Sequence, residues 1–543
     1  MQSLFVPTEP ALFSGDLHNS ITWGYDLPGA PDSEPLRNSI YFEETDTRSL
    51  RTILRSQTEE KLFFAEQLFR NYAGLSDDAR HFAFENLFTR LLPEAAPGWP
   101  NVYQWDDGVL SLAGVLPDGS VPPQGSTAAL KNYSRNMSAD GSRLLFSAAP
   151  EPEAQPQLYQ RIEGNRTVWI SEPEGSDKSQ PVNVFLQAAT PDGRNVFFVT
   201  DSPLLDADQS PGPDLYRWSD GPDPEHESTN LTLITHDGSV PSNFFGGSVD
   251  GVSDDGQIVY IQTISSKLEV WDHGTMHIIA QPVDRPVNLE DQFTVNASIP
   301  GRGRATANGE FFAFLPQTSG DAELTESELY LYSLADEELV CASCLSGGDS
   351  PPAKVEPLGP NVTSSPAEYK LRFVRPRFLA EDGRVFFSTT ASLVPEDTNG
   401  TWDAYQFDPG SGAPSLLSSG RGENPTAFID ASASGNDVFI ATRQHLVGAD
   451  TDELVDEYDV RTGGGFPEPE PAAAPCTGEG CRGAASGAPA GAAVSSTAPS
   501  RGNVKAHRCR KAKRGENGGG NARCVRRHRH PHSRTHGDRG RRK

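Results

Sequence analysis

The sequence contains no long apolar run and none of the short motifs that mark the common enzyme classes. No apolar stretch approaches the roughly 20 residues that a membrane-spanning helix needs, so no transmembrane segment is expected. A G-x-S-x-G nucleophile elbow, a phosphate-binding glycine loop and an H-E-x-x-H zinc motif are all absent, and no dinucleotide-binding glycine fingerprint stands between a predicted strand and a predicted helix. These absences favour a protein that is not an enzyme, although they leave the question open.

Apolar residues make up only 36% of the 543 residues, while glycine (51) and proline (44) are plentiful. This balance is low for a compact α/β enzyme and typical of a turn-rich β protein with long loops. The one convincing helix signal is Ser56-Gln-Thr-Glu59, a capping box that precedes the apolar segment KLFFAEQLFR. We expect this short helix to pack against a neighbouring sheet.

A glycine turn followed by a β-branched or aromatic run recurs along most of the chain. The clearest copies are ADGSRLLFSA (Gly141), PDGRNVFFVT (Gly193), DDGQIVYIQT (Gly256), ANGEFFAFLP (Gly309), EDGRVFFSTT (Gly383) and ASGNDVFIAT (Gly435). In DDARHFAFEN, Ala79 stands where glycine would, so a different turn is expected there. A fainter eighth copy starts near Leu17.

Each turn-strand is followed by a second strand with an aromatic pattern, such as LYRWSDG or AYQFDPG, and often by a third. With one strand before each turn, the unit is a four-stranded antiparallel meander. One such sheet cannot bury both of its faces, so neighbouring sheets must stack. The sequence therefore predicts an all-β fold, a β-propeller of seven or eight four-stranded blades. Trp105, Trp218, Trp271 and Trp402 recur near the second strand, and we expect them to fill the space between sheets rather than to stack on sugars.

The repeat, with its S-x-DG-x-x-φ-x-F-x-S, LY-x-x and LT elements, resembles that of TolB-type, WD-like propeller proteins. The longer form LVPEDTNGTWDAYQFD, with VCASC before it and CTGEGC after it, is similar to a set of exported bacterial propeller proteins. The resemblance covers roughly residues 10–482 and implies the fold and an extracytoplasmic setting. It implies no activity.

The composition changes at Gly463, which divides the chain into four predicted parts. Residues 1–75 hold a worn or incomplete first repeat with the inserted helix, and residues 76–462 hold the propeller repeats. A linker rich in Pro, Ala, Gly and Ser follows over 463–500, and a basic tail over 501–543 is expected to be disordered.

The net charge of −28 conceals a strong asymmetry between the tail and the rest. The tail holds 16 of the 46 Lys and Arg residues and only two of the 74 acids, which leaves the first 500 residues at −42. An acidic body repels nucleic acid, so no specific nucleic-acid partner is expected. Only the tail has the charge to contact anionic polymers, and an unbound, solubilising tail is an equal alternative.

The six cysteines fall into three local pairs: Cys341 with Cys344, Cys476 with Cys481, and Cys509 with Cys524. An even count in near-neighbour pairs favours disulfides and an oxidising compartment over a zinc knuckle or a redox motif. Met1–Pro10 nevertheless has neither the basic nor the apolar region of a signal peptide. We expect a secreted or envelope protein whose given start lies downstream of the natural one; a genuine short amino-terminus is the alternative.

The best chemical signal is a set of oxygen-bearing side chains at positions i, i+2 and i+6, just before the second strand of the repeat. It occurs three times, as Asp397, Asn399 and Asp403, as Asp450, Asp452 and Asp456, and as Asp208, Ser210 and Asp214. Such a loop could bind Ca²⁺, but it lacks the closing Glu of an EF-hand. The alternative is that these side chains cap turns through hydrogen bonds to the backbone. Calcium is the one cofactor considered.

Three functions follow from these patterns. The first is a non-enzymatic extracytoplasmic scaffold that binds an unidentified protein or envelope polymer across one face of the ring. The alternative is a propeller glycosidase or lyase with carboxylates in the central funnel. A third is a structural protein that calcium stabilises.

Overall fold

The computed structural model describes residues 12–14, 18–24, 39–44, 46–47, 49–53, 72–86, 90–129, 136–210, 212–221, 230–236, 249–262, 268–279, 303–315, 328–345, 353–354 and 376–465. The chain divides into two units, Met1–Glu470 and Pro471–Lys543, and all described residues belong to the first. The predicted helix after Ser56, the predicted linker from residue 466 on and the predicted tail lie outside these ranges.

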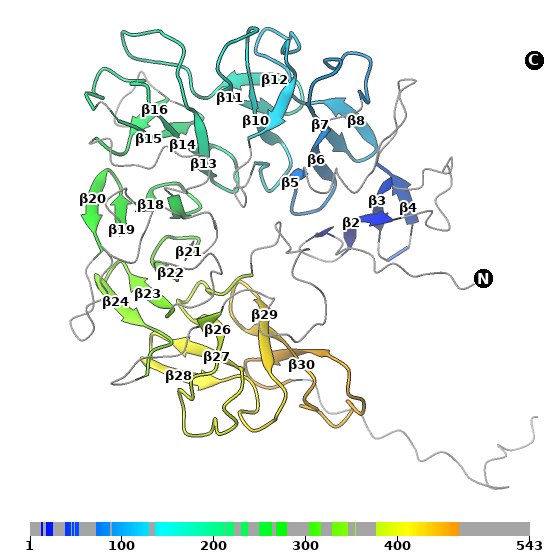
Figure 1. Cartoon of the computed structure of the whole chain (residues 1–543), viewed down its shortest axis with the longest axis vertical. Coiled ribbons are helices and arrows are strands. Elements are labelled where there is room, and N and C mark those ends of the chain that lie inside the picture. Colours follow the sequence, from blue (N-terminus) through cyan, green and yellow to red (C-terminus); the bar gives the residue numbers. More distant parts are fainter. Residues whose placement is uncertain are drawn as a thin grey trace, which may run out of the picture. The chain divides into compact units, whose positions relative to one another are not determined.

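The described residues form 31 strands and no helix, arranged in eight antiparallel sheets (Figure 1). The first four sheets consist of β1 (Leu12–Phe13), β2 (Asn19–Gly24), β3 (Ser39–Glu44) and β4 (Ser49–Thr52); β5 (Tyr72–Leu75), β6 (His81–Asn86), β7 (Asn101–Asp106) and β8 (Val109–Leu112); β9 (Ser126–Ala128), β10 (Arg143–Ala148), β11 (Gln157–Ile162) and β12 (Arg166–Trp169); β13 (Phe185–Ala189), β14 (Asn195–Thr200), β15 (Asp214–Ser219) and β16 (Leu231–Leu233).

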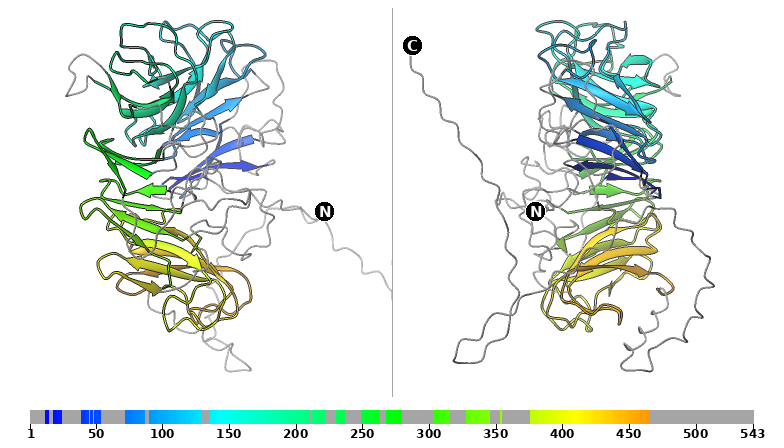
Figure 2. Two further views of the ribbon diagram at one scale, coloured as in Figure 1. Left: turned by 60° about the vertical axis from the view of Figure 1, so that its left-hand side comes forward. Right: turned by 90° about the vertical axis from the view of Figure 1, so that its right-hand side faces the viewer.

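The remaining sheets consist of β17 (Val249–Val252), β18 (Ile258–Gln262), β19 (Leu268–Asp272) and β20 (Thr275–Ile278); β21 (Gly303–Ala305), β22 (Phe311–Phe314), β23 (Tyr330–Ser333) and β24 (Glu338–Cys341); β25 (Ala353–Lys354), β26 (Val385–Thr389), β27 (Asp403–Asp408) and β28 (Ala413–Leu416); and β29 (Thr426–Ala431), β30 (Asp437–Thr442) and β31 (Asp456–Arg461). Every sheet is a meander in which strands adjacent in the chain are neighbours in the sheet, and only the last has three strands among the described residues. Figure 2 shows the strands from two further directions. The all-β, four-stranded architecture predicted from the sequence is therefore present. Among these residues no helix is long and apolar enough to span a membrane.

Alternate side chains of each second strand pack against different neighbouring sheets. In β14, Phe198 packs with Leu145 of the preceding sheet, and Phe197 packs with Val259 of the following one. The other apolar clusters likewise join consecutive sheets. Successive side chains of a strand point to opposite faces of its sheet, and here both faces are buried. The sequences of these strands are therefore nearly continuous apolar runs. Three of the four tryptophans, Trp105, Trp218 and Trp271, are buried in these clusters as expected.

The turn before each second strand makes the same contact with the preceding sheet. Gly141 has a φ of 73°, and a Cβ there would lie 2.3 Å from the His81 ring at the start of β6. Gly256 repeats this against Asn195 at the start of β14, at 2.9 Å. The other contacts of this kind are Gly193 with Arg143, Gly309 with Ile258, Gly383 with Phe311 and Gly435 with Arg384. Glycine is needed both for the left-handed backbone and for the close approach.

Ala79 corrects one expectation, because its turn is the same as the glycine turns. Its φ is 57°, and its amide donates to the carbonyl of Ser76 as that of Gly141 does to Ser138. The preceding sheet presents Asn19 here, whose side-chain amide donates to the carbonyl of Asp78 at 3.0 Å. The left-handed alanine costs about 1 kcal/mol of backbone strain.

Candidate calcium loops

The strongest candidate site is the Asp397 loop, residues 397–403, which leads into β27. The carboxylate of Asp397 is 5% exposed, and its Oδ2 accepts a hydrogen bond from the hydroxyl group of Tyr405. Its Oδ1 is buried and has no hydrogen-bond partner. The protein therefore holds one oxygen of this carboxylate by a hydrogen bond. The other oxygen is available to a hydrogen-bond donor or a cation.

Asp403, the last residue of the loop, has the same arrangement. It is fully buried, and its Oδ1 accepts hydrogen bonds from the Ser418 hydroxyl at 2.5 Å and from the Gly420 amide at 3.3 Å. Its Oδ2 has no partner. Burial raises the pKa of Asp403, and the nearby Asp397 carboxylate raises it further, while the Ser418 hydrogen bond and the nearby Asn399 amide, which does not reach hydrogen-bond geometry, partly offset the rise. A cation would relieve both causes.

Asn399 completes the set. Its Oδ1 accepts the Thr401 amide at 3.0 Å, which is the turn-capping bond expected of an Asx residue. Its Nδ2 is buried without an acceptor. The loop thus gathers two carboxylate oxygens that the protein does not satisfy, beside the Asn399 Oδ1, which accepts one hydrogen bond and has a second lone pair. Oxygen donors of this kind are the ligands that Ca²⁺ prefers, so the residues present fit this ion.

The Asp450 loop, residues 450–456, has the same spacing in the last sheet but is more exposed. One ligand atom from each of Asp450, Asp452 and Asp456 lies within 4.8 Å of the others. The Tyr458 hydroxyl donates to Asp450, and Oδ2 of Asp456 is buried without a partner. Three carboxylates converge here, but water reaches them more easily than in the Asp397 loop.

In the Asp208 loop, residues 208–214, hydroxyl groups donate hydrogen bonds to the carboxylate oxygens that a cation would otherwise bind. Ser210 donates to Oδ2 of Asp214, and Thr235 donates to its Oδ1 at 2.7 Å. Oδ1 of Asp208 accepts the Ser210 amide at 3.0 Å, and Tyr216 donates to Oδ2. Every carboxylate oxygen of this loop has a donor, so the turn-capping alternative describes it.

A fourth loop of this kind was missed because it has lost both aspartates. LLPEAAPGWPNVYQWD aligns with LVPEDTNGTWDAYQFD, which places Ala95 and Asn101 at the positions of Asp397 and Asp403. The Asn101 side chain accepts the Ala96 amide at 3.0 Å and donates to the carbonyls of Ala96 and Trp99. The side-chain amide of Asn101 thus holds this Ala95 loop, residues 95–101, together by hydrogen bonds, and the loop contains no charged residue. The shared L-x-P-E and Y-Q residues were the signal that could have found it.

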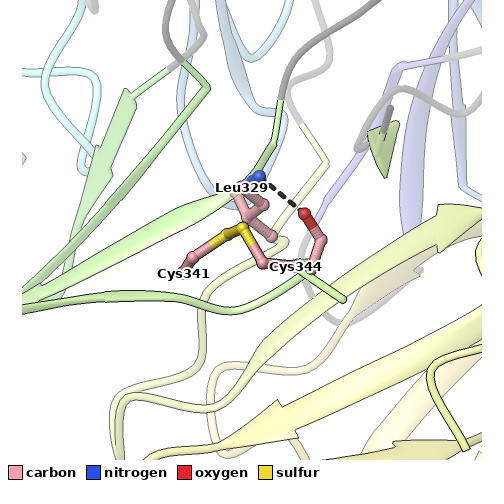
Figure 3. Close-up of a disulfide and its surroundings, with 4 residues drawn as sticks. Leu329, Cys341 and Cys344 are labelled. Carbon is pink, nitrogen blue, oxygen red and sulfur yellow. Dashed lines mark hydrogen bonds between the residues drawn. A yellow bond between two sulfur atoms is a disulfide. The ribbon is translucent and has the colours of Figure 1, made fainter. Parts of the chain in front are cut away.

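Of the predicted disulfides, only the pair Cys341 and Cys344 falls within the described residues. The two cysteines form a disulfide at the end of β24, with their Cα atoms 5.6 Å apart (Figure 3). Between them, the Ser343 hydroxyl accepts the Leu329 amide at 2.9 Å. Cys476, Cys481, Cys509 and Cys524 lie outside the described residues.

No family model matches the chain, and no curated protein is similar to it in sequence. Solved structures with detectable likeness include the tricorn protease (11% identity, 84% of this chain, 44% of that chain, TM-score 0.28). Others are prolyl oligopeptidase B from Galerina marginata (11%, 82% and 56%, TM-score 0.34) and puromycin hydrolase (11%, 80% and 58%, TM-score 0.33). The chain spans about half the length of these proteins, and a likeness at this level assigns it neither an activity nor a site.

These comparisons overturn two expectations. The resemblance to TolB-type propeller proteins is wrong, since no family model matches and the structures named above are two proteases and a hydrolase. The two leading functional predictions, a non-enzymatic binding scaffold and a propeller glycosidase or lyase, are corrected by the same finding. Short glycine-turn motifs are shared by many stacked-sheet proteins, so they identified the architecture without identifying the family.

Proposed function

We propose that this chain is a calcium-binding repeat protein in which Asp397, Asn399 and Asp403 hold a structural Ca²⁺. The observation that carries the proposal is the pair of buried, unpartnered carboxylate oxygens, Oδ1 of Asp397 and Oδ2 of Asp403. Leaving such groups unsatisfied costs several kcal/mol, and a cation between them removes that cost. The Asp450 loop is the proposed second and weaker position.

The donor set favours calcium over other common metals. Zinc sites in proteins use mainly Cys and His, and neither residue type occurs in residues 397–403. Magnesium requires a small octahedral shell, whereas calcium accepts six to eight oxygen ligands, including carbonyls and water, on a flexible loop. In this role the ion neutralises two carboxylates and fixes the entry into β27.

We propose further that the eight sheets form one β-propeller. The recurring contact between each turn and the preceding sheet, such as Gly256 with Asn195, supports this arrangement. An extracytoplasmic location agrees with the Cys341–Cys344 disulfide and with a loop that needs abundant calcium. The tail from residue 501 is proposed to contact anionic polymers through its charge.

Isothermal titration of chelator-treated protein with CaCl₂ tests the calcium proposal. Asp403→Asn should weaken the tighter binding event about tenfold or more, because it removes one charged ligand. The matched control is Asp214→Asn in the Asp208 loop, where the Ser210 hydroxyl can rotate to accept a hydrogen bond from the new amide. This variant should bind calcium as wild-type protein does. The proposal fails if wild-type protein gives no saturable binding, or if Asp403→Asn binds calcium as wild type does.

A further inference from the structure

The last sheet, β29–β31, has less apolar support than the others. On one side, Phe428 and Val438 join the apolar cluster of the sheet β25–β28. On the other side, the buried cluster among the described residues consists of Ala427 and Ala441, against which the partly buried Ile429 and Val455 pack, and Phe439 is 39% exposed. This sheet also has three strands among the described residues where the others have four. Its position therefore depends heavily on its contacts with the sheet before it.

The Asp397 loop makes hydrogen bonds to both ends of the connection that leads into this last sheet. At the near end, Oδ1 of Asp403 accepts from Ser418 and Gly420, and the Thr398 amide donates to the carbonyl of Gly420 at 2.8 Å. At the far end, the Thr426 amide, at the start of β29, donates to the carbonyl of Trp402 at 2.8 Å. A change in the loop is therefore transmitted directly to β29.

Without a cation, the buried carboxylates of Asp397 and Asp403 repel each other across this loop. The Asp208 loop, by contrast, is closed by the hydroxyls of Ser210 and Thr235, and the Ala95 loop by the amide of Asn101. The sheets β5–β8 and β13–β16 thus need no metal at the equivalent position. Among the four loops compared, unpaired carboxylate oxygens occur only in the Asp397 and Asp450 loops.

We infer that calcium in the Asp397 loop controls the docking of β29–β31 on the sheet β25–β28. This inference rests on the proposed calcium site. With the ion bound, the loop is closed and both ends of the 418–426 connection are fixed. Without it, the carboxylates separate, the bonds to Ser418, Gly420 and Thr426 are lost, and the last sheet opens locally while the preceding sheets stay folded.

Hydrogen exchange of the full chain, measured by mass spectrometry in CaCl₂ and in EDTA, tests this coupling. In EDTA, the amides of residues 418–431 should exchange at least about tenfold faster, as expected for local opening. Peptides covering residues 195–219, which include the Asp208 loop, should not change and serve as the internal control. The double variant Asp397→Asn/Asp403→Asn removes the repulsion, so its exchange should be slow and insensitive to calcium.

The possible failures of the two proposals can be told apart. If titration shows calcium binding but the exchange of residues 418–431 is the same in both buffers, the docking inference is wrong and the calcium site stands. If no calcium binds, both are wrong. Equal acceleration in residues 195–219 would also overturn the inference, since the effect would then be global. The comparison of the two buffers on wild-type protein decides the matter even if the double variant does not fold.

Discussion

The hydroxyl group of Tyr405 donates a hydrogen bond to the carboxylate of Asp397, eight residues earlier in the chain. The same pairing joins Tyr216 to Asp208 and Tyr458 to Asp450. Burial raises the pKa of Tyr405, and the bond to Asp397 raises it further, so the phenol stays protonated and acts as a donor. Each tyrosine thus holds one oxygen of the first aspartate and orients the other toward the loop.

Replacing Tyr405 by phenylalanine should lower the free energy of unfolding by about 1–2 kcal/mol, the cost of leaving a buried carboxylate oxygen unpaired. It should also weaken calcium binding, because Asp397 loses the bond that orients it. Urea unfolding and calcium titration measure the two effects. Tyr103→Phe, in the uncharged Ala95 loop, should cost stability but leave calcium affinity unchanged; equal affinities for all three proteins would contradict this role.

Glu85 should make stability depend on pH near neutrality. Its Oε2 accepts the Ala128 amide of the next sheet at 3.0 Å, and burial raises its pKa from 4.5 to about 7 despite that bond. The native protein therefore keeps a proton that the unfolded chain releases between these two values. The contribution of Glu85 to the free energy of unfolding is greatest below pH 4.5. It falls by about 3 kcal/mol as the pH rises to about 7.

The Glu85→Gln variant should remove this loss, because its side chain is neutral throughout and can still accept the Ala128 amide. Urea unfolding at about pH 5 and about pH 8 should show a smaller difference for this variant than for wild type. Glu94→Gln, at an exposed position, is the control and should retain the wild-type difference. An unchanged difference in Glu85→Gln would show that another group is responsible.

The glycine turns and apolar strands could be predicted because their causes are local. A left-handed turn needs Gly141 or an equivalent whatever the distant sequence, and alternation marks which side chains are buried. Whether the carboxylate oxygens of each candidate loop find hydrogen-bond donors could not be predicted, because the donors come from distant parts of the sequence. Asp214 is satisfied by Thr235 from beyond the next strand, whereas Asp403 depends on Ser418 and still has one oxygen unpaired.

Gly141→Ala should be far more damaging than Gly164→Ala, although both glycines have a φ near 70°. A methyl group at Gly164 meets nothing within 4 Å, so the cost there is the backbone strain of about 1 kcal/mol. At position 141 it overlaps the His81 ring, which should add about 2 kcal/mol. Urea unfolding measures the difference, and His81→Gly, which removes both the ring and the Cβ atom 2.4 Å away, should restore part of the stability of Gly141→Ala. Equal costs would contradict the close contact between sheets.

Removing the Cys341–Cys344 disulfide should have a modest effect. The bond closes a loop of four residues, for which the chain-entropy argument gives about 2 kcal/mol, less than for a long loop. The double variant Cys341→Ser/Cys344→Ser should lose about this much in urea unfolding, and added reductant should lower wild-type stability to the same level. A loss of folding in the variant would contradict this estimate.

Terbium luminescence tests the calcium site most directly. Tb³⁺ takes the same oxygen ligands as Ca²⁺ and emits when a neighbouring indole is excited, and Trp402 is adjacent to Asp403 in the loop. Excitation of tryptophan should give terbium emission that CaCl₂ abolishes by competition. Trp402→Phe should lose the emission while keeping its calcium affinity, and Asp397→Asn/Asp403→Asn should lose both. Emission that persists at full strength in the double aspartate variant would contradict the assignment of calcium to this loop.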